Sequence, residues 1–412
     1  MKSDLDRLMQ ARDLAAFVIA IDHNYSPPLD YLTDGVHISR GLAIKKQGET
    51  PVLIVDPMER EEASATGLPI RTFTDMGWLD MLESADGDRV AAEIVFWGHC
   101  LKELGVESGK IGIYGVSDLN LILELVRLMD AQYPEYAFVG EMGTTLFEEA
   151  AITKDADEIA RMQSVAERTS AVMEATWQFI SGHSDSDGVV VNVQGEPLTI
   201  GAVKRFVRRE LLDRNLEDTG MIFAQGRDGG IPHSHGQDDM ALKTGESIVF
   251  DLFPREMGGG YHHDMTRTWC IGYAPPHVQN AYEQVMSAFD IAVETFAVGK
   301  PTHMMQEAVQ GYFEAQGHPT ARNQPGTTNG YVHGLGHGIG LQVHEKPGIN
   351  HIGKEDVFMV GNIITIEPGL YYPESEQGGF GVRVEDTCYV NENGELISIT
   401  PFRKDLVLPL KG

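Results

Sequence analysis

The sequence predicts an α+β protein of two domains: an α/β domain over residues 1–150, then a mixed domain of long helices and strands over residues 151–412. Three observations support this. Short apolar runs alternate with amphipathic patterns in the first part, a long capped helix follows residue 150, and several later strands end in a charged residue. At 412 residues and 42% hydrophobic content, two cores can be buried.

The N-terminal part is read as alternating strands and helices. Its apolar runs are bounded by turn residues, as expected of buried strands, at residues 17–21, 41–46, 51–56 and 110–115. Residues 89–105 and 118–130 carry apolar side chains at helical spacing. This alternation is typical of an α/β domain.

The domain boundary is placed at the start of a long helix, residues 153–180. Asp155 followed by Glu158 forms a capping box in which Asp takes the Ser/Thr role. A helix over residues 201–215 comes next. Beyond it, strands are predicted at residues 247–251, 265–272, 363–372 and 381–390, and helices at residues 278–296 and 302–317.

Composition excludes several classes of function. The 61 acidic residues against 32 basic ones give a net charge of −29, which repels the phosphates of nucleic acids. Three cysteines in so long a chain do not form a disulfide framework. The N-terminus lacks the features of a signal peptide, and no stretch reaches the roughly 18 apolar residues of a membrane span. We therefore expect a soluble, cytoplasmic protein that binds neither nucleic acid nor membrane.

Four carboxylates stand at the ends of apolar strands, namely Asp251, Asp264, Glu367 and Glu385. Each alone could be a cap, a surface charge or a salt-bridge partner. Four of them in one pocket could not all ionise without cations. Together with His337 they favour a site for two divalent ions, although spacing alone does not show that they converge.

His337 lies in the stretch HGLGHGIGLQVHE, residues 333–345. Two histidines four residues apart suggest a helical zinc pair. However, glycine alternates through the stretch, and each glycine costs a helix about 1 kcal/mol relative to alanine. We therefore expect a loop that runs into a strand, with the remaining ligands supplied from elsewhere. Oxygen ligands with one imidazole suit manganese first, with cobalt, zinc or iron as alternatives.

The stretch 333–345, DMTRT after Asp264, IEPG at 366–369 and GVRVED at 381–386 together resemble the pita-bread metallopeptidases. The form of the histidine stretch is similar to the proline-specific branch, prolidase and aminopeptidase P. The resemblance covers residues 150–412 strongly and the N-terminal half only in its α/β character. It implies a creatinase-like N-terminal domain, a pita-bread catalytic domain and a homodimer.

The resemblance also implies roles for the ligands. Asp251 would chelate one metal and Asp264 would bridge both; His337 and Glu367 would complete the second metal's shell, and Glu385 would bridge again. A hydroxide held between the metals would attack the peptide carbonyl. Glu367 would carry the proton of the water to the leaving nitrogen.

Further residues would surround the reacting bond. His344 and His233 would donate hydrogen bonds to the substrate carbonyl or the oxyanion. His333 would line the pocket near the residue that follows the cleaved bond. Arg383 shares a strand face with Glu385 and would orient it or meet a substrate carboxylate.

Structural alternatives remain for each of these residues. His344 could be a bonded strand histidine, His333 a structural loop residue and Arg383 a purely structural partner, while His235 competes with His233. His262 and His263 are expected to be solvated loop residues.

The resemblance implies hydrolysis of an Xaa-Pro bond in a small peptide, as a dipeptidase or an aminopeptidase. Two other functions remain open: a metal-dependent hydrolase or lyase of a non-peptide metabolite, and a binding module without activity. Asp251 and Asp264 are thirteen residues apart where the family usually has eleven, and the segment between Glu367 and Glu385 also carries extra residues. Both insertions put the choice of substrate in doubt.

Overall fold

A computed structural model describes residues 4–411, and the chain divides into two compact units. The first unit contains residues 1–151 with Gly258–Gly260, and the second contains Ile152–Met257 with Tyr261–Gly412.

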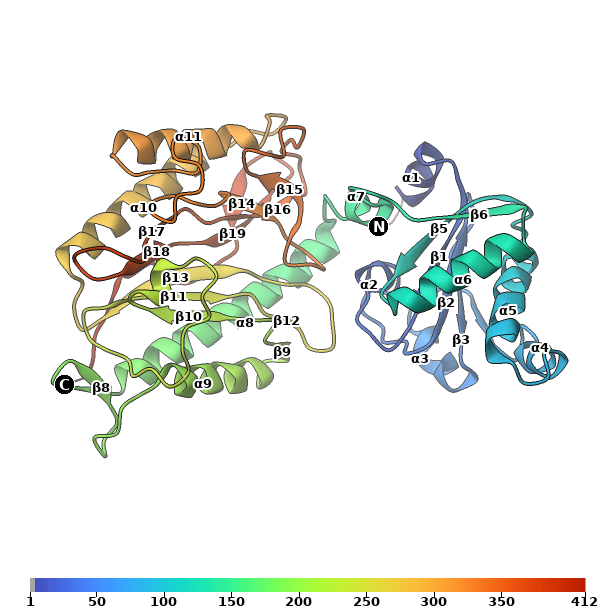
Figure 1. Cartoon of the computed structure of the whole chain (residues 1–412), viewed down its shortest axis with the longest axis horizontal. Coiled ribbons are helices and arrows are strands. Elements are labelled where there is room, and N and C mark those ends of the chain that lie inside the picture. Colours follow the sequence, from blue (N-terminus) through green and yellow to red (C-terminus); the bar gives the residue numbers. More distant parts are fainter. Residues whose placement is uncertain (1–3, 412) are drawn as a thin grey trace. The chain divides into compact units, whose positions relative to one another are not determined.

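The first unit is built on a six-stranded sheet in the order β4-β3-β2-β1-β5-β6 (Figure 1). Its strands are β1 (Leu14–Ile21), β2 (Gly41–Lys46), β3 (Val52–Val55), β4 (Ile70–Thr72), β5 (Gly109–Gly115) and β6 (Tyr136–Val139). Its helices are α1 (Leu5–Ala11), α2 (Pro27–Thr33), α3 (Arg60–Ser64), α4 (Trp78–Ser84), α5 (Arg89–Glu103), α6 (Leu119–Gln132) and α7 (Leu146–Ala150), with a 3-10 turn η1 (Pro57–Glu59).

The central strand β1 runs parallel to β5 and antiparallel to β2. Its side chains alternate between the two faces of the sheet. Ala16 and Val18 belong to the core that α5 and α6 cover, whereas Phe17 packs edge-on against Phe147 of α7, with ring centroids 5.2 Å apart. A strand buried on both faces explains why residues 17–21 are apolar without interruption.

The second unit begins with α8 (Ala156–Ser181), and Asp155 and Glu158 form both hydrogen bonds of the predicted capping box. The other helices are α9 (Ile200–Leu212), α10 (Pro276–Thr295) and α11 (His303–Ala315), with a 3-10 turn η2 (Asp228–Gly230). In Figure 1, α9 lies beside β10, α10 beside β17 and β18, and α11 beside β15. These helices lie within a few residues of the predicted ranges.

The strands of the second unit form two larger sheets and three small pairs. The order β10-β11-β13-β21 forms one sheet and β15-β14-β16-β19-β20 the other; β17-β18, β12-β9 and β7-β8 pair separately. The bounds are β7 (Ser184–Ser186), β8 (Val189–Val191), β9 (Leu216–Glu217), β10 (Ile222–Gln225), β11 (Ser247–Leu252), β12 (Arg255–Glu256), β13 (Met265–Ile271), β14 (Gly336–Gly338), β15 (Glu345–Ile349), β16 (Ile363–Ile366), β17 (Gly369–Tyr372), β18 (Phe380–Arg383), β19 (Asp386–Val390), β20 (Leu396–Ser398) and β21 (Val407–Leu408).

Two predicted strands are each broken in two, which corrects the sequence interpretation. The run 363–372 divides into β16 and β17 at Glu367, and the run 381–390 divides into β18 and β19 at Glu385. Pro368 has no N–H to continue a ladder. The N–H of Glu367 donates instead to the carbonyl of Leu335 at 2.8 Å, and the N–H of Glu385 donates to that of Thr266 at 3.0 Å. Each break therefore ties a carboxylate-bearing residue to a different strand or loop.

Cys100, Cys270 and Cys388 are free and buried, as the low cysteine count predicted. Within residues 4–411, no helix has both the length and the apolar character that a membrane crossing requires.

Candidate metal centre

Five separate segments of the second unit bring the predicted ligands together. Asp251 lies on β11, and Asp264 directly precedes β13, which pairs with β11. His337 is the middle residue of β14, and Glu367 and Glu385 stand at the two strand breaks. Because β14 and β19 both pair with β16, these segments meet at one place.

The donor atoms lie at distances suited to shared cations. One ligand atom each from Asp264, His337 and Glu385 lies within 4.8 Å of the others. His337 Nε2 is 3.6 Å from Glu367 Oε1 and 3.9 Å from Asp264 Oδ2. Burial and the charges of Glu385 and Asp251 raise the pKa of Asp264, so Asp251 belongs to the same cluster.

Burial of this cluster leaves acceptor atoms without partners. Among the described residues, Asp251 Oδ1, Asp264 Oδ1 and Glu385 Oε1 are buried with no hydrogen-bond donor. Buried oxygens in this state are costly unless something else satisfies them. Three orphaned carboxylate oxygens beside an imidazole fit divalent cations, and no cysteine is among the described residues that line the site.

Without cations, the pKa values of three carboxyl groups are raised, namely those of Glu385, Asp264 and Glu367. Burial, reinforced by the neighbouring Asp251 charge, raises the pKa of Glu385 to about 8. Burial and the charge of Glu385 also raise the pKa values of Asp264 and Glu367 well above their usual range. Burial lowers the pKa of His337 to about 3, so its imidazole is neutral and can act as a ligand.

Backbone contacts fix the orientation of the His337 ring. Its Nδ1 lies 3.0 Å from the carbonyl of Gly338, so Nδ1 carries the proton and donates. Nε2 therefore presents its lone pair toward Asp264 and Glu367. This is the usual arrangement of a histidine ligand, in which one nitrogen is held by an acceptor and the other is left for the metal.

The alternating glycines allow this close packing. A Cβ at Gly336 would lie 2.0 Å from the carbonyl oxygen of Thr365, and one at Gly338 would lie 2.1 Å from that of Lys346. The expected loop is a three-residue strand followed by a turn. Any side chain at these two positions would push His337 away from the carboxylates.

Arg383 pairs with Asp251 rather than with Glu385, which differs from the predicted contact. Its Nη2 donates to Asp251 Oδ2 at 2.6 Å, and its Nε donates to Thr266 Oγ1 at 3.1 Å. The hydroxyl of Thr266 in turn donates to Glu385 Oε2 at 2.7 Å. Arg383 therefore holds Asp251 directly and reaches Glu385 only through Thr266.

Tyr371 was not recognised from the sequence. Its hydroxyl accepts from Arg383 Nη1 at 2.9 Å and lies 2.8 Å from His333 Nε2. His333 Nδ1 donates to the carbonyl of Gly334 at 2.7 Å, so Nε2 is the acceptor for Tyr371. Strand alternation places Tyr371 on the same face of the β17–β18 pair as Arg383, because Gly369, two residues earlier, is the register partner of Arg383.

The other predicted histidines line a cavity of about 530 Å³ together with the carboxylates. The His344 ring lies edge-on to His337, with centroids 4.3 Å apart. His235 uses Nδ1 on the carbonyl of Met221 at 3.0 Å, whereas the His233 ring has no hydrogen bond within residues 4–411. This leaves His233 the freer of the two to contact a ligand.

His262 and His263 are buried, which corrects the expectation of solvated loop residues. His262 packs against the segment after His337, with its N–H donating to the carbonyl of Gly340 at 2.8 Å. His263 Nε2 lies 3.1 Å from Thr400 Oγ1. Burial lowers the pKa of His262 to about 4 and that of His263 to about 3, so both support the cluster as neutral rings.

A buried ion pair secures the end of the histidine stretch. Lys154 Nζ lies 2.7 Å from Glu345 Oε2, with side chains only 1% and 3% exposed. Glu345 Oε1 also accepts from the N–H of Gln342 at 3.0 Å. The turn that carries His344 is therefore bound to the segment before α8.

The model of metallopeptidase family M24 matches residues 160–392, which hold all five predicted ligands. The chain belongs to metallopeptidase family M24. This M24 chain is 27% identical over 391 residues to an Xaa-Pro dipeptidase of Pyrococcus horikoshii, covering 94% of this chain and 93% of that one. It is 34% identical over 174 residues to the probable dipeptidase PepE of Mycobacterium tuberculosis, a match over less than half of that relative, 42% of its length.

Solved structures support the fold of this M24 member. The X-Pro aminopeptidase of Thermotoga maritima superposes with a TM-score of 0.74 at 20% identity, covering 97% of this chain and 99% of that one. At this identity the likeness concerns the fold alone. The predicted two-domain fold class and the resemblance to the proline-specific branch of the pita-bread metallopeptidases are confirmed.

Proposed function

We propose that this chain is a metal-dependent peptidase that hydrolyses an Xaa-Pro bond, as a dipeptidase or an aminopeptidase. The observation that carries the proposal is the set of orphaned carboxylate oxygens around His337, inside a cavity large enough for a small peptide. The relationship over most of the chain to an Xaa-Pro dipeptidase supports the substrate class. Within this proposal, residues 1–150 form the creatinase-like domain and residues 151–412 the catalytic domain.

We propose Asp251, Asp264, His337, Glu367 and Glu385 as the ligands of two divalent cations, with manganese as the first candidate. Such cations, when bound, supply Lewis-acid activation of water and of the substrate carbonyl. The neutral His337 and the unpartnered oxygens support this ligand set.

Glu367 is proposed as the proton carrier of the reaction. Peptide hydrolysis adds water to the carbonyl carbon, breaks the C–N bond and moves one proton from the water to the leaving nitrogen. Burial raises the pKa of Glu367, which makes its carboxylate a stronger proton acceptor than an exposed one. Its N–H, held by Leu335, keeps the side chain at the end of β16.

The surrounding residues are proposed to bind and orient the peptide. His233 and His344 line the cavity and would donate to the substrate carbonyl or the developing oxyanion. His333 would contact the residue after the cut, with its tautomer set by Gly334 and Tyr371. Arg383 would hold Asp251 in place and supply positive charge beside the substrate. We further propose that the protein is a homodimer and is located in the cytoplasm.

Hydrolysis of Ala-Pro, Ala-Pro-Ala and Ala-Ala with added Mn²⁺ tests it, using chelated protein and Asp264→Asn as inactive controls. Cleavage of Ala-Pro alone indicates a dipeptidase, and cleavage of Ala-Pro-Ala indicates an aminopeptidase. Preference for Ala-Ala over both proline peptides would refute the specificity. Failure to cleave any of the three, in protein shown to contain metal, would refute the peptidase and favour a non-peptide substrate.

A further inference from the structure

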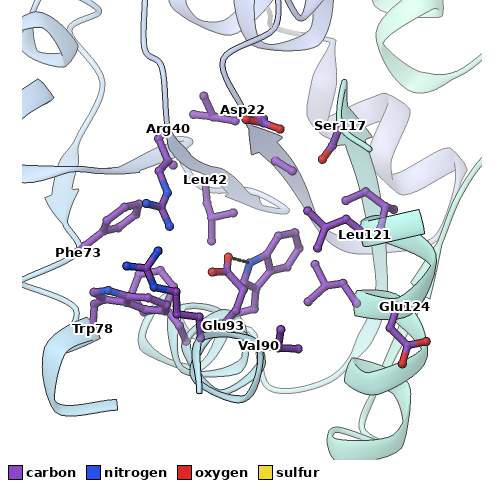
Figure 2. Close-up of a pocket in the computed structure, with 18 of the residues that line it drawn as sticks. Asp22, Arg40, Leu42, Phe73, Trp78, Val90, Glu93, Ser117, Leu121 and Glu124 are labelled. Atoms are coloured by element: carbon purple, nitrogen blue, oxygen red, sulfur yellow. Dashed lines mark hydrogen bonds between the residues drawn. The ribbon is translucent and has the colours of Figure 1, made fainter. Parts of the chain in front are cut away.

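The N-terminal unit contains a second cavity of about 530 Å³, separate from the metal centre (Figure 2). It lies where β1 ends at Ile21, and it is also lined by Ser117, just after β5. These two strands are parallel neighbours, and the chain leaves β1 toward β2 but leaves β5 toward β6, on opposite sides. In open α/β sheets, ligands bind at such a point, outside the carboxyl ends of the strands.

The walls of the cavity are apolar and aromatic. Phe73, Trp78 and Phe96 pack together, with the rings of Trp78 and Phe96 5.3 Å apart and those of Phe73 and Phe96 5.5 Å apart. Two further lining residues, Val90 and Leu121, are 55% and 56% exposed. Figure 2 shows Phe73, Trp78, Val90 and Leu121 around one hollow. A flat or branched apolar group would gain contact with aromatic faces there and remove exposed aliphatic surface from water.

The charged side chains that line the cavity differ in their hydrogen-bond and ion-pair partners. Glu93 accepts from the indole N–H of Trp97 at 3.0 Å, and Glu124 pairs with Arg127 at 2.5 Å. Asp22 accepts from the N–H of His23 at 2.9 Å.

The guanidinium groups of the two arginines, Arg40 and Arg89, have no carboxylate partner within residues 4–411. That of Arg40 contacts a ring face, with its central carbon 5.7 Å from the centroid of Phe73. Arg40 and Arg89 therefore present two guanidinium groups without an ion-pair partner among the described residues, beside the aromatic wall and near Asp22 and Glu93, whose carboxylates accept from neutral N–H groups.

We propose that this cavity is a second ligand site, for a small carboxylate with an aromatic or bulky apolar body. The planar guanidinium groups would bind the carboxylate in the paired geometry that arginine favours. The aromatic wall would receive the apolar body. A cavity of this size lies within the range that holds small ligands. The site does not depend on the proposed peptidase activity.

The test uses the full chain labelled with 5-fluorotryptophan and the probe 3-phenylpropionate, followed by ¹⁹F NMR. The chain has four tryptophans, each assignable by a Trp→Phe variant; Trp78 and Trp97 line the cavity, whereas Trp177 and Trp269 belong to the other unit. We expect the resonances of Trp78 and Trp97 to shift in a saturable way while those of Trp177 and Trp269 stay in place. Binding at the metal centre alone would not give this pattern and would overturn the proposal.

Two comparisons separate recognition of the carboxylate from general apolar binding. The variant with both Arg40→Gln and Arg89→Gln should bind the probe at least tenfold more weakly, while Arg71→Gln, at an exposed arginine outside the cavity, should bind it normally. The alcohol 3-phenyl-1-propanol should bind at least tenfold more weakly than the acid. Equal affinity of the double variant, or of the alcohol, would overturn the proposal, as would no shift at 10 mM probe.

Discussion

The buried pair of Lys154 and Glu345 gives a prediction whose size follows from the structure. Both side chains are almost fully buried, so water solvates neither charge. Removing one member of a buried pair leaves an uncompensated charge and costs about 3–5 kcal/mol. At about 2–4 °C per kcal/mol for a domain of this size, Lys154→Met should lower Tm by roughly 6–20 °C.

The assay is a thermal and denaturant unfolding cycle with Lys154→Met, Glu345→Gln and the double variant. The amide introduced by Glu345→Gln would keep an acceptor for the N–H of Gln342 but carry no charge. The double variant leaves no charge buried, so it should be more stable than the sum of the single changes predicts. We expect a coupling free energy of about 1–3 kcal/mol.

An exposed pair provides the matched control. Lys243 and Glu246 lie 3.0 Å apart with side chains 52% and 37% exposed, so Lys243→Met should cost less than about 1 kcal/mol. If Lys154→Met destabilises no more than this control, burial does not set the strength of the pair. If the two single changes add without coupling, the two charges do not depend on one another, and the argument is wrong.

Three further predictions concern the metal site and pH. Glu367→Gln should reduce kcat by about 100-fold or more while Tm stays close to that of the parent; wild-type turnover would refute the proton role. Removal of metal with a chelator should lower Tm, and Mn²⁺ at about 100 times its Kd should restore about 2.7 kcal/mol of unfolding free energy for each independent site; an unchanged Tm after verified metal loss would contradict a shared site. Burial lowers the pKa of His318, so only the unfolded chain takes up its proton below about pH 6.5. The stability that His318 contributes is therefore full above that pH and lost as pH falls below it, and the slope measured from urea unfolding between pH 7 and 5 should be shallower in His318→Gln; an equal slope would refute this.

The sequence predicts the helices and most strands because their signals are local. The capping box at Asp155 and the apolar run of β1 depend only on neighbouring residues. The broken strands at Glu367 and Glu385 were missed because the partners of their N–H groups, Leu335 and Thr266, are distant along the chain. Apolar periodicity continues across the break at Glu385, so no local signal marks it, whereas Pro368 is a local signal of the break at Glu367.

For the metal centre, too, one part could be predicted from the sequence and another part could not. The residue types at the strand ends indicated which side chains to suspect, and the glycines around His337 excluded a helix. The partners of each side chain could not be predicted. Arg383 bonds to Asp251 on β11, and His262 and His263 are buried by segments that follow them by more than 70 residues.

The pairing of Arg383 with Asp251 changes the charge balance that the sequence suggested. Four carboxylates alone would be neutralised by two divalent ions, leaving no preference for an anion. The guanidinium of Arg383 lies within the same buried site, 2.6 Å from Asp251. It changes the net charge of these protein groups to −3 when all the carboxylates are ionised. With two divalent ions and the hydroxide that the resemblance implies between them, the site would then be neutral overall. A neutral site has no net attraction for an anion, so the free carboxylate of a dipeptide, one residue from the bond that is cut, would be favoured only by direct contact with Arg383. If Arg383 meets the substrate carboxylate, kcat/KM for Ala-Pro should exceed that for Ala-Pro amide, and equal values would contradict this role of Arg383.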